Sequence, residues 1–275
     1  LMEAAQTCNE LIGIYIFSQQ QWDLHHESNV KQDFLLRNLS ALEKQLSKLH
    51  IPLIVLQTDT YQTLPNDLYR FADAHQIKSF FWNNEFGVNE NKRDDAVEAL
   101  ICANNFEISR HHDQVIYEPG FLKTGQGKPF SVFTPFKRRW IENFSMSFLN
   151  LGQPTKPLIK TNLPSDLTAM PFIKSHKVDM THWPVGETAA NSRLQDFLDQ
   201  KIKNYSESRN TPMLEGTSRI SPYLALGVIS PRRCILEALK LNDFDFSSGN
   251  QGICKWVDEI VWREFYRNIM HSFPK

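Results

Sequence analysis

Residues 205–233 constrain the chain more than any other stretch, because they contain two adjacent helix starts rich in polar groups. Ser221 directly precedes Pro222, a pair typical of a helix start, which predicts that Ser221 caps a helix. The run GTSRIS at residues 216–221 adds two more hydroxyls and one guanidinium beside the free backbone N–H groups of that start. Such donors suit a phosphate or pyrophosphate. An ordinary capped helix remains the alternative.

The same pattern recurs at Ser230 and Pro231, where Arg232 and Arg233 occupy the first turn of a second predicted helix. Cations at the N-terminal end of a helix oppose its dipole. We therefore expect these two arginines to be held there for an anion outside the helix. Two ordinary Ser-Pro caps are again the alternative.

Residues 256–267 (WVDEIVWREFYR) predict a helix with an unusual mixture of aromatic and charged side chains on one side. Spacings of three and four bring five of them onto neighbouring rows, namely Trp256, Glu259, Trp262, Arg263 and Tyr266. A helix side that only packs against an apolar surface would not carry these charged residues. The alternative is an i,i+4 pair of Glu259 with Arg263, worth about 0.3–0.5 kcal/mol, with the tryptophans in the core.

Taken together, these stretches closely resemble the flavin-binding domain of the photolyase and cryptochrome family. The TSRIS, SPR and WREFYR blocks occur in this order, and the similarity is greatest to bacterial class I cyclobutane pyrimidine dimer photolyases. The resemblance extends upstream through residues 88–90 (VNE) and 133–137 (FTPFK), so it covers essentially the whole chain. Family members carry further sequence at both ends, so the chain is expected to be a fragment that does not retain FAD stoichiometrically alone.

Composition sets limits on the function classes. A chain of 275 residues, 41% of them hydrophobic, predicts a sizeable core and two domains. The net charge of −1 means that any contact with nucleic acid depends on a local basic patch. The four cysteines are far apart without a C-x-x-C pair, which predicts neither zinc nor disulfides and favours a reducing cytoplasm.

The sequence also argues against a metal site and a membrane span. The histidine pairs at residues 25–26 and 111–112 lack the i,i+4 spacing of a helical metal site. No apolar run approaches the roughly 20 residues of a membrane span, and the first residues do not resemble a signal peptide.

The first half of the chain alternates predicted strands and helices. The predicted strands are residues 11–17, 51–57, 77–82 and 115–117, and the predicted helices are 34–50, 65–76 and 91–103. This alternation indicates an α/β domain with a doubly wound parallel sheet. No G-x-G-x-x-G follows a strand, so a dinucleotide site of that type is not supported.

We expect three segments. Residues 1–140 form the α/β antenna domain, and the resemblance implies that its first strand is missing ahead of Leu1. Residues 141–186 form a proline-rich interdomain linker. Residues 187–275 begin an all-α FAD-binding domain with an apolar helical stripe of Leu194, Phe197, Leu198 and Ile202. Lys137, Arg138 and Arg139 are expected on a solvated face.

The resemblance implies site residues for three ligands. FAD would be bound by Tyr205, Thr217, Ser218, Arg219, Ile220, Ser221 and Trp256. DNA would be faced by Arg209, Glu259, Ile260, Val261, Trp262, Arg263, Glu264, Phe265 and Tyr266, with Glu259 and Trp262 assisting at the substrate. An antenna pigment, methenyltetrahydrofolate, would contact His25, Asn89 and Glu90. A polar loop that caps the following helix is the alternative for Asn89 and Glu90.

The implied activity is light-dependent repair of pyrimidine dimers in DNA by a monomeric deoxyribodipyrimidine photo-lyase. Electron transfer from excited, reduced FAD splits the cyclobutane ring, and the electron then returns. The rival is a cryptochrome, a blue-light photoreceptor without repair activity, and a DNA-binding module without flavin is a third reading. The presence of both Glu259 and Trp262 favours repair, whereas Asn268 departs from the histidine frequent at that position in these photolyases.

Overall fold

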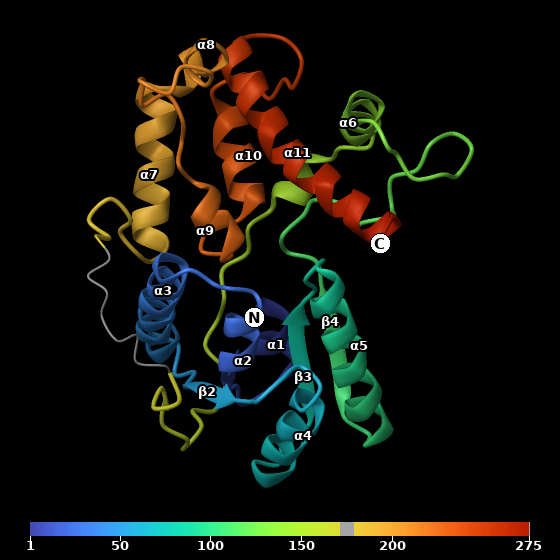
Figure 1. Cartoon of the computed structure of the whole chain (residues 1–275), viewed down its shortest axis with the longest axis vertical. Helices are drawn as coiled ribbons and strands as arrows, with labels where there is room; N and C mark the ends of the chain where they lie inside the picture. Colours follow the sequence, from blue (N-terminus) through green and yellow to red (C-terminus); the bar gives the residue numbers. More distant parts are fainter. Residues whose placement is uncertain (171–178, 275) are drawn as a thin grey trace. The chain divides into compact units, whose positions relative to one another are not determined.

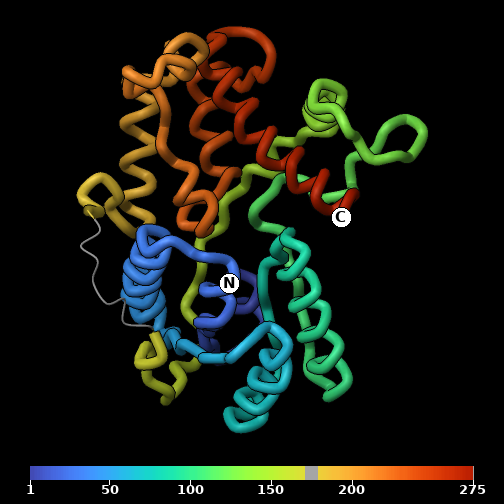
Figure 2. Tube along the Cα trace, viewed as in Figure 1, coloured from blue at the N-terminus to red at the C-terminus, as the bar shows by residue number. Residues whose placement is uncertain are grey.

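The computed structural model describes residues 1–170 and 179–274, which divide into two compact units. Unit 1 comprises Leu1–Asn84, Asn89–His111 and Gly152–Gly186. Unit 2 comprises Glu85–Val88, His112–Leu151 and Glu187–Lys275. Figure 2 traces the chain through the segments of each unit. The predicted division at residues 140 and 186 stays a prediction about domains.

Unit 1 is built from parallel strand pairs and helices. Strand β1 (Gly13–Phe17) pairs in parallel with β2 (Leu53–Gln57), and β3 (Ser79–Asn83) pairs in parallel with β4 (Glu107–His111). The helices are α1 (Met2–Thr7), α2 (Gln19–Leu24), α3 (Asn29–Lys48), α4 (Leu64–Ala74) and α5 (Val88–Ala103). Strands and helices alternate along the chain (Figure 1), which confirms the predicted α/β class with parallel strands.

The core of unit 1 explains why its strands are apolar runs. Phe17, Leu53 and Val55 of β1 and β2 are buried against α3, with Leu39 and Leu46 on the facing side. A second cluster joins α4, β3 and α5 through Leu64, Leu68, Ala72, Phe80, Val97 and Ile101. Parallel strands covered on both faces need such continuous apolar sequence.

One predicted strand is wrong. Residues 115–117 are not a strand, because the backbone N–H groups of Ile116 and Tyr117 donate to the carboxylate of Glu264. The fourth strand is instead β4, which pairs with β3 from Ser79 opposite Glu107 onward. The sequence of β4, EISRH, is too polar to show the apolar run by which strands were recognised.

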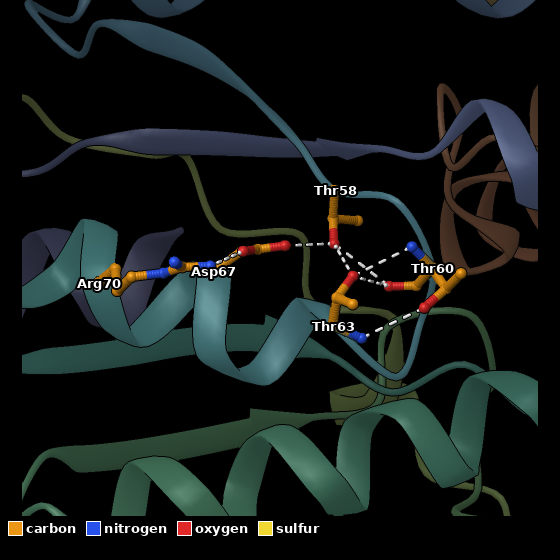
Figure 3. Close-up of polar contacts among 5 residues, drawn as sticks. All are labelled: Thr58, Thr60, Thr63, Asp67 and Arg70. Carbon is orange, nitrogen blue, oxygen red and sulfur yellow. Dashed lines mark hydrogen bonds and ion pairs between the residues drawn. The ribbon is translucent and has the colours of Figure 1, made fainter.

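The turn between β2 and α4 is fixed by a polar network (Figure 3). The buried hydroxyl of Thr58 donates to the Asp67 carboxylate at 2.6 Å and lies 2.9 Å from the Thr63 hydroxyl. Thr63 in turn accepts from the backbone N–H of Thr60 at 3.1 Å, and Asp67 accepts from Arg70 at 2.5 Å. Each of these groups satisfies another, so the network stabilises the turn.

Unit 2 is helical. It contains α6 (Phe133–Glu142), η1 (Met146–Leu149), α7 (Glu187–Gln200), η2 (Ile202–Asn204), α8 (Tyr205–Ser208), α9 (Ser221–Ala225), α10 (Pro231–Lys240) and α11 (Gln251–Ser272). The long helix α11 packs against α6, η2, α8 and α10. Asn250 caps it by accepting from the N–H of Ile253 at 3.1 Å. Within residues 1–170 and 179–274, no helix is long and apolar enough to cross a membrane.

The predicted apolar stripe is confirmed, since Leu194, Phe197, Leu198 and Ile202 are all buried. The predicted solvated face is wrong for one member. Lys137 forms an ion pair with Asp258 of α11 at 2.6 Å, and both side chains are largely buried. This pair holds α6 to α11.

Candidate functional site

The run at residues 216–221 forms a loop that ends in a short helix. Helix α9 has five residues, its N-cap is Ile220, and no side chain caps it, so the predicted cap by Ser221 is wrong. The helix begins one residue earlier than expected, and the N–H groups of Tyr223 and Leu224 both donate to the Ile220 carbonyl. The Ser221 hydroxyl is therefore left at the surface.

A buried aromatic wall supports this loop. The indole N–H of Trp256 donates to the Ser218 hydroxyl at 3.3 Å. The Trp256 ring lies 5.2 Å from Phe197, which lies 5.8 Å from Tyr205, and all three side chains are buried. The structure thus brings Tyr205, Ser218 and Trp256 of the predicted cofactor set into one cluster of unit 2.

The loop is also tightly held at its beginning. A Cβ atom at Gly216 would clash with the side chain of Ser208, whose hydroxyl donates to the Gly216 carbonyl at 3.4 Å. Arg219 has a φ of +50° and pairs with Glu215 at 3.1 Å. A positive φ at a non-glycine residue fixes the direction in which the chain leaves the loop.

The donor set of this loop fits an anionic dinucleotide. Thr217, Arg219 and Ser221 are exposed, Ser218 is half-buried and Ile220 is buried. Two exposed hydroxyls and one guanidinium on one loop suit the phosphates of such a ligand. Because α9 is so short, its dipole contributes little to binding an anion. The fit depends on the side chains.

At the second predicted anion site the cap is confirmed, and both arginines have partners inside unit 2. The Ser230 hydroxyl accepts from the N–H of Arg232 at 3.1 Å, as expected for an N-cap. The Arg232 guanidinium donates to the carbonyls of Phe148, Asp113 and His112 at 3.0–3.3 Å. Arg233 pairs with Glu237. Both cations therefore have partners within unit 2.

The alternative reading of α11, in which Glu259 pairs with Arg263, is wrong. Glu259 forms an ion pair with Arg209, whose guanidinium lies 5.6 Å from the Tyr205 ring centroid. Arg263 instead donates to the carbonyls of Gln114 at 2.5 Å and Leu224 at 3.3 Å. Burial lowers the pKa of Arg263 to about 10, so it stays charged at neutral pH.

An aromatic group lies one helical turn beyond Glu259. The Trp262 ring stacks on Phe133 of α6, with centroids 3.7 Å apart and planes inclined by 10°. The Tyr266 ring lies 5.5 Å from the Trp262 ring and is 59% exposed, whereas Trp262 is half-buried. Glu259 and Trp262 lie three residues apart, hence on one side of α11.

The other predicted DNA-facing residues of α11 point into unit 2. Ile260, Val261 and Phe265 are buried, and Glu264 is only 6% exposed. Arg209, Glu259, Trp262, Arg263 and Tyr266 are at least partly exposed. The buried group can support these side chains but does not itself reach a ligand outside the unit.

The predicted antenna residues lie at helix ends in unit 1. His25 is the exposed C-cap of α2. Asn89 and Glu90 lie in the first turn of α5, which begins at Val88, so the alternative reading as a loop before the helix is wrong. No hydrogen bond joins His25 to either of them in the part of the chain that the structure describes. Their role with a pigment stays a prediction.

The first 158 residues of the chain match a known protein family. The model of the family described as DNA photolyase matches residues 1–158, more than half of the chain. The chain belongs to the DNA photolyase family. This confirms the resemblance on which the sequence interpretation depends.

Relatives of the family match along nearly the full chain. The deoxyribodipyrimidine photo-lyase of Vibrio cholerae is 28% identical over 279 residues, which covers 100% of this chain and 58% of that protein. The enzyme of the same name from Escherichia coli is 29% identical over 270 residues, with 96% and 55% covered. The chain thus spans little more than half the length of these relatives.

Two solved structures share the fold. A bacterial class III photolyase from Agrobacterium tumefaciens superposes with a TM-score of 0.81 at 25% identity, covering 99% of this chain and 55% of that one. A Synechocystis cryptochrome superposes with a TM-score of 0.72 at 21% identity, covering 94% and 55%. Both support the predicted combination of an α/β part and a helical part in this photolyase-family chain.

Two contacts of these site residues were not predicted from the sequence. Phe133 belongs to the FTPFK motif that supported the resemblance, but nothing in its local sequence indicates stacking on Trp262. Arg209 and Glu259 were both predicted to face DNA, yet their mutual pairing spans 50 positions and leaves no periodic signal.

Proposed function

We propose that this protein acts in light-dependent repair of cyclobutane pyrimidine dimers in DNA, with reduced FAD as its cofactor. The observation that carries the proposal is the half-buried Trp262 ring, stacked on Phe133 and one turn from the Glu259–Arg209 pair. An indole surface beside charged donors and acceptors suits two pyrimidines taken out of the DNA stack. Membership of the DNA photolyase family supports the same assignment.

In this proposal the exposed side chains at the end of α8 and on α11 have different roles. Trp262 and Tyr266 offer aromatic surface to the unstacked pyrimidines, which a dimer presents at low cost because it is already poorly stacked. The guanidinium of Arg209 binds a phosphate. Glu259 accepts a hydrogen bond from a pyrimidine N–H, because a carboxylate near DNA is otherwise repelled by phosphates.

The loop at residues 216–221 is the proposed place for the FAD phosphates. The hydroxyls of Thr217 and Ser221 and the guanidinium of Arg219 bind the pyrophosphate, while Trp256 and Tyr205 support the loop from behind. When bound, FAD supplies the electron donor that light excites. We further propose a folate antenna, methenyltetrahydrofolate, near His25, Asn89 and Glu90, and a monomeric protein in the cytoplasm.

A cryptochrome, which senses blue light without repair, is the second candidate. The fold shared with the Synechocystis cryptochrome is the observation that keeps it open. Both candidates bind FAD, so flavin absorbance does not separate them. Loss of dimers from DNA does.

The experiment is a repair assay on the protein loaded with reduced FAD. An oligonucleotide with one thymine cyclobutane dimer is incubated with the protein in blue light, and restored thymine is quantified, with a dark sample as control. Restoration in light alone is the expected result. Bound flavin without restored thymine in light refutes repair and supports the photoreceptor reading.

A further inference from the structure

A buried carboxylate joins α11 to a segment with no regular structure of its own. We call residues 114–120 the strap. Glu264 of α11 accepts from the strap N–H groups of Ile116 at 2.8 Å and Tyr117 at 2.9 Å. Successive N–H groups directed at one carboxylate leave that part of the strap little freedom to move.

Neighbouring side chains of α11 hold the two ends of the strap. Arg263 donates to the Gln114 carbonyl at 2.5 Å, and Arg267 donates to the Gln114 side-chain oxygen at 2.6 Å. Asn268 accepts from the N–H of Gly120 at 2.9 Å. Hydrogen bonds to side chains of α11 therefore hold the strap against this helix.

The same carboxylate reaches α6. The indole N–H of Trp140 donates to Glu264 at 3.0 Å, and the Tyr117 hydroxyl donates to the Trp140 carbonyl at 3.1 Å. Trp140 is fully buried, and its ring packs edge-on against Tyr117. The carboxylate of Glu264 thus links the strap and α6 to α11.

Helix α6 connects Glu264 to the proposed DNA-binding surface. Trp140 lies near its C-terminal end, while Phe133 at its first position stacks on Trp262. Phe136 between them packs on Phe265 at 5.2 Å. A shift of α6 along α11 would therefore move Phe133 relative to the Trp262 ring.

Burying a carboxylate costs free energy, which three directed N–H donors offset only when all three are aligned. A buried carboxylate therefore adds little to the stability of the fold, but it fixes the positions of the three groups that donate to it. We infer that Glu264 is a positioning residue, which holds α6 and the strap on α11 so that Phe133 and Trp262 form one stacked surface for the dimer. This inference depends on the proposed repair function.

The test is the ratio of affinities for dimer-containing and undamaged DNA, measured by fluorescence anisotropy for wild type, Glu264→Gln and Trp140→Phe. The amide introduced by Glu264→Gln has one acceptor oxygen and cannot serve all three donors, whereas Trp140→Phe removes the indole N–H but keeps an aromatic ring. We expect the ratio to fall roughly tenfold in Glu264→Gln and roughly threefold in Trp140→Phe. Affinity for undamaged DNA should stay unchanged, because phosphate contacts do not depend on the stack.

Leu194→Ala is the matched control, because it weakens the core of unit 2 on α7 and lies outside the hydrogen bonds that join Glu264, the strap and α6. All variants are compared at equal folded fraction, determined by circular dichroism. An unchanged ratio in Trp140→Phe and Glu264→Gln overturns the inference, as does an equal fall in Leu194→Ala. If Glu264→Gln does not fold, Trp140→Phe decides alone.

The failure of the proposed function has a different signature. If wild-type protein shows no preference for dimer-containing DNA, the repair proposal fails, and the positioning role toward a dimer fails with it. If wild type shows the preference and the variants retain it, only the positioning role fails.

Discussion

The guanidinium of Arg209 and the carboxylate of Glu259 form an ion pair that joins the end of α8 to the middle of α11. Their side chains are 26% and 32% exposed, so water weakens the attraction between them. Hydrogen bonding to Glu259 raises the pKa of Arg209 further, so the arginine is charged at any pH of interest. The pair is accessible enough for a ligand to replace one partner.

Glu259→Ala should separate stability from recognition. We expect it to lower the free energy of unfolding by less than about 1 kcal/mol, as for a partly exposed ion pair. Affinity for dimer-containing DNA should fall by the equivalent of about 1–3 kcal/mol, because a hydrogen bond to the base is lost. Urea unfolding and anisotropy titration measure the two effects.

Glu237→Ala is the control for this prediction, since it removes an ion-paired carboxylate from α10 instead. Equal loss of affinity in both variants would show that the position of Glu259 is not the cause. Wild-type affinity in Glu259→Ala would remove it from the surface that contacts the substrate.

Arg209→Ala should act on all DNA alike. A guanidinium that binds phosphate carries no sequence information, so affinities for damaged and undamaged DNA should fall by the same factor. The slope of log affinity against log salt should become less steep by about 0.9, as for one phosphate contact fewer. A loss confined to damaged DNA would place Arg209 at the bases instead.

Gly252→Ala should destabilise unit 2. A Cβ atom at this position of α11 would clash with the backbone carbonyls of Ile202 and Lys203 in η2. Relief of that clash requires backbone movement, so we expect a loss of about 1–3 kcal/mol in the free energy of unfolding. Gly125→Ala is the matched control, because a Cβ there meets nothing within 4 Å. Equal stability of the two variants in urea would contradict the packing of α11 on η2.

Glu264 should make stability depend on pH. Burial raises the pKa of its carboxyl from 4.5 to about 7, although three N–H donors and the charge of Arg232 act in the opposite direction. The native state therefore binds the proton more tightly than the unfolded state. The resulting stabilisation is complete below pH 4.5 and is lost as the pH rises toward 7, by on the order of 3 kcal/mol.

Urea unfolding at pH 5, 6, 7 and 8 measures this contribution as the difference between wild type and Glu264→Gln. The free energy of unfolding of wild type should fall with rising pH more steeply than that of the variant, which cannot titrate at this position. Parallel curves would show that Glu264 keeps the same charge in both states.

The parallel strands were predictable because burial on both faces requires continuous apolar sequence. The runs at residues 11–17 and 51–57 predicted β1 and β2 to within two residues. The strand β4 was missed because Glu107 and Arg110 interrupt its apolar pattern. Residues 115–117 were mistaken for a strand because Glu264, far along the chain, supplies the acceptors that a neighbouring strand would supply.

The site was predictable only where it is local. The residues from Thr217 to Ile220 form the loop that leads into the helix start, as their sequence indicated, although Ser221 is the first helical residue and not the cap. Local spacing suggested an ion pair of Glu259 with Arg263. In the structure Arg263 instead donates to carbonyl groups, and Glu259 pairs with Arg209. Partners brought together by tertiary folding leave no periodicity in sequence, so these contacts required the structure.

In the proposed function, recognition of a dimer depends most on the stacked ring of Trp262. Its replacement by alanine removes the aromatic surface but leaves Arg209 and Glu259 in place. Stacking on an aromatic side chain is worth about 1–3 kcal/mol per base. Trp22→Ala, which removes a half-buried tryptophan from α2, is the matched control.

The most direct measurement is the ratio of affinities for dimer-containing and undamaged oligonucleotides, in wild type, Trp262→Ala and Trp22→Ala. We expect a clear preference for the dimer in wild type and Trp22→Ala, and a preference reduced by roughly 5- to 150-fold in Trp262→Ala, the equivalent of about 1–3 kcal/mol. An equal preference in all three proteins, or none in wild type, would contradict recognition of the dimer at this surface.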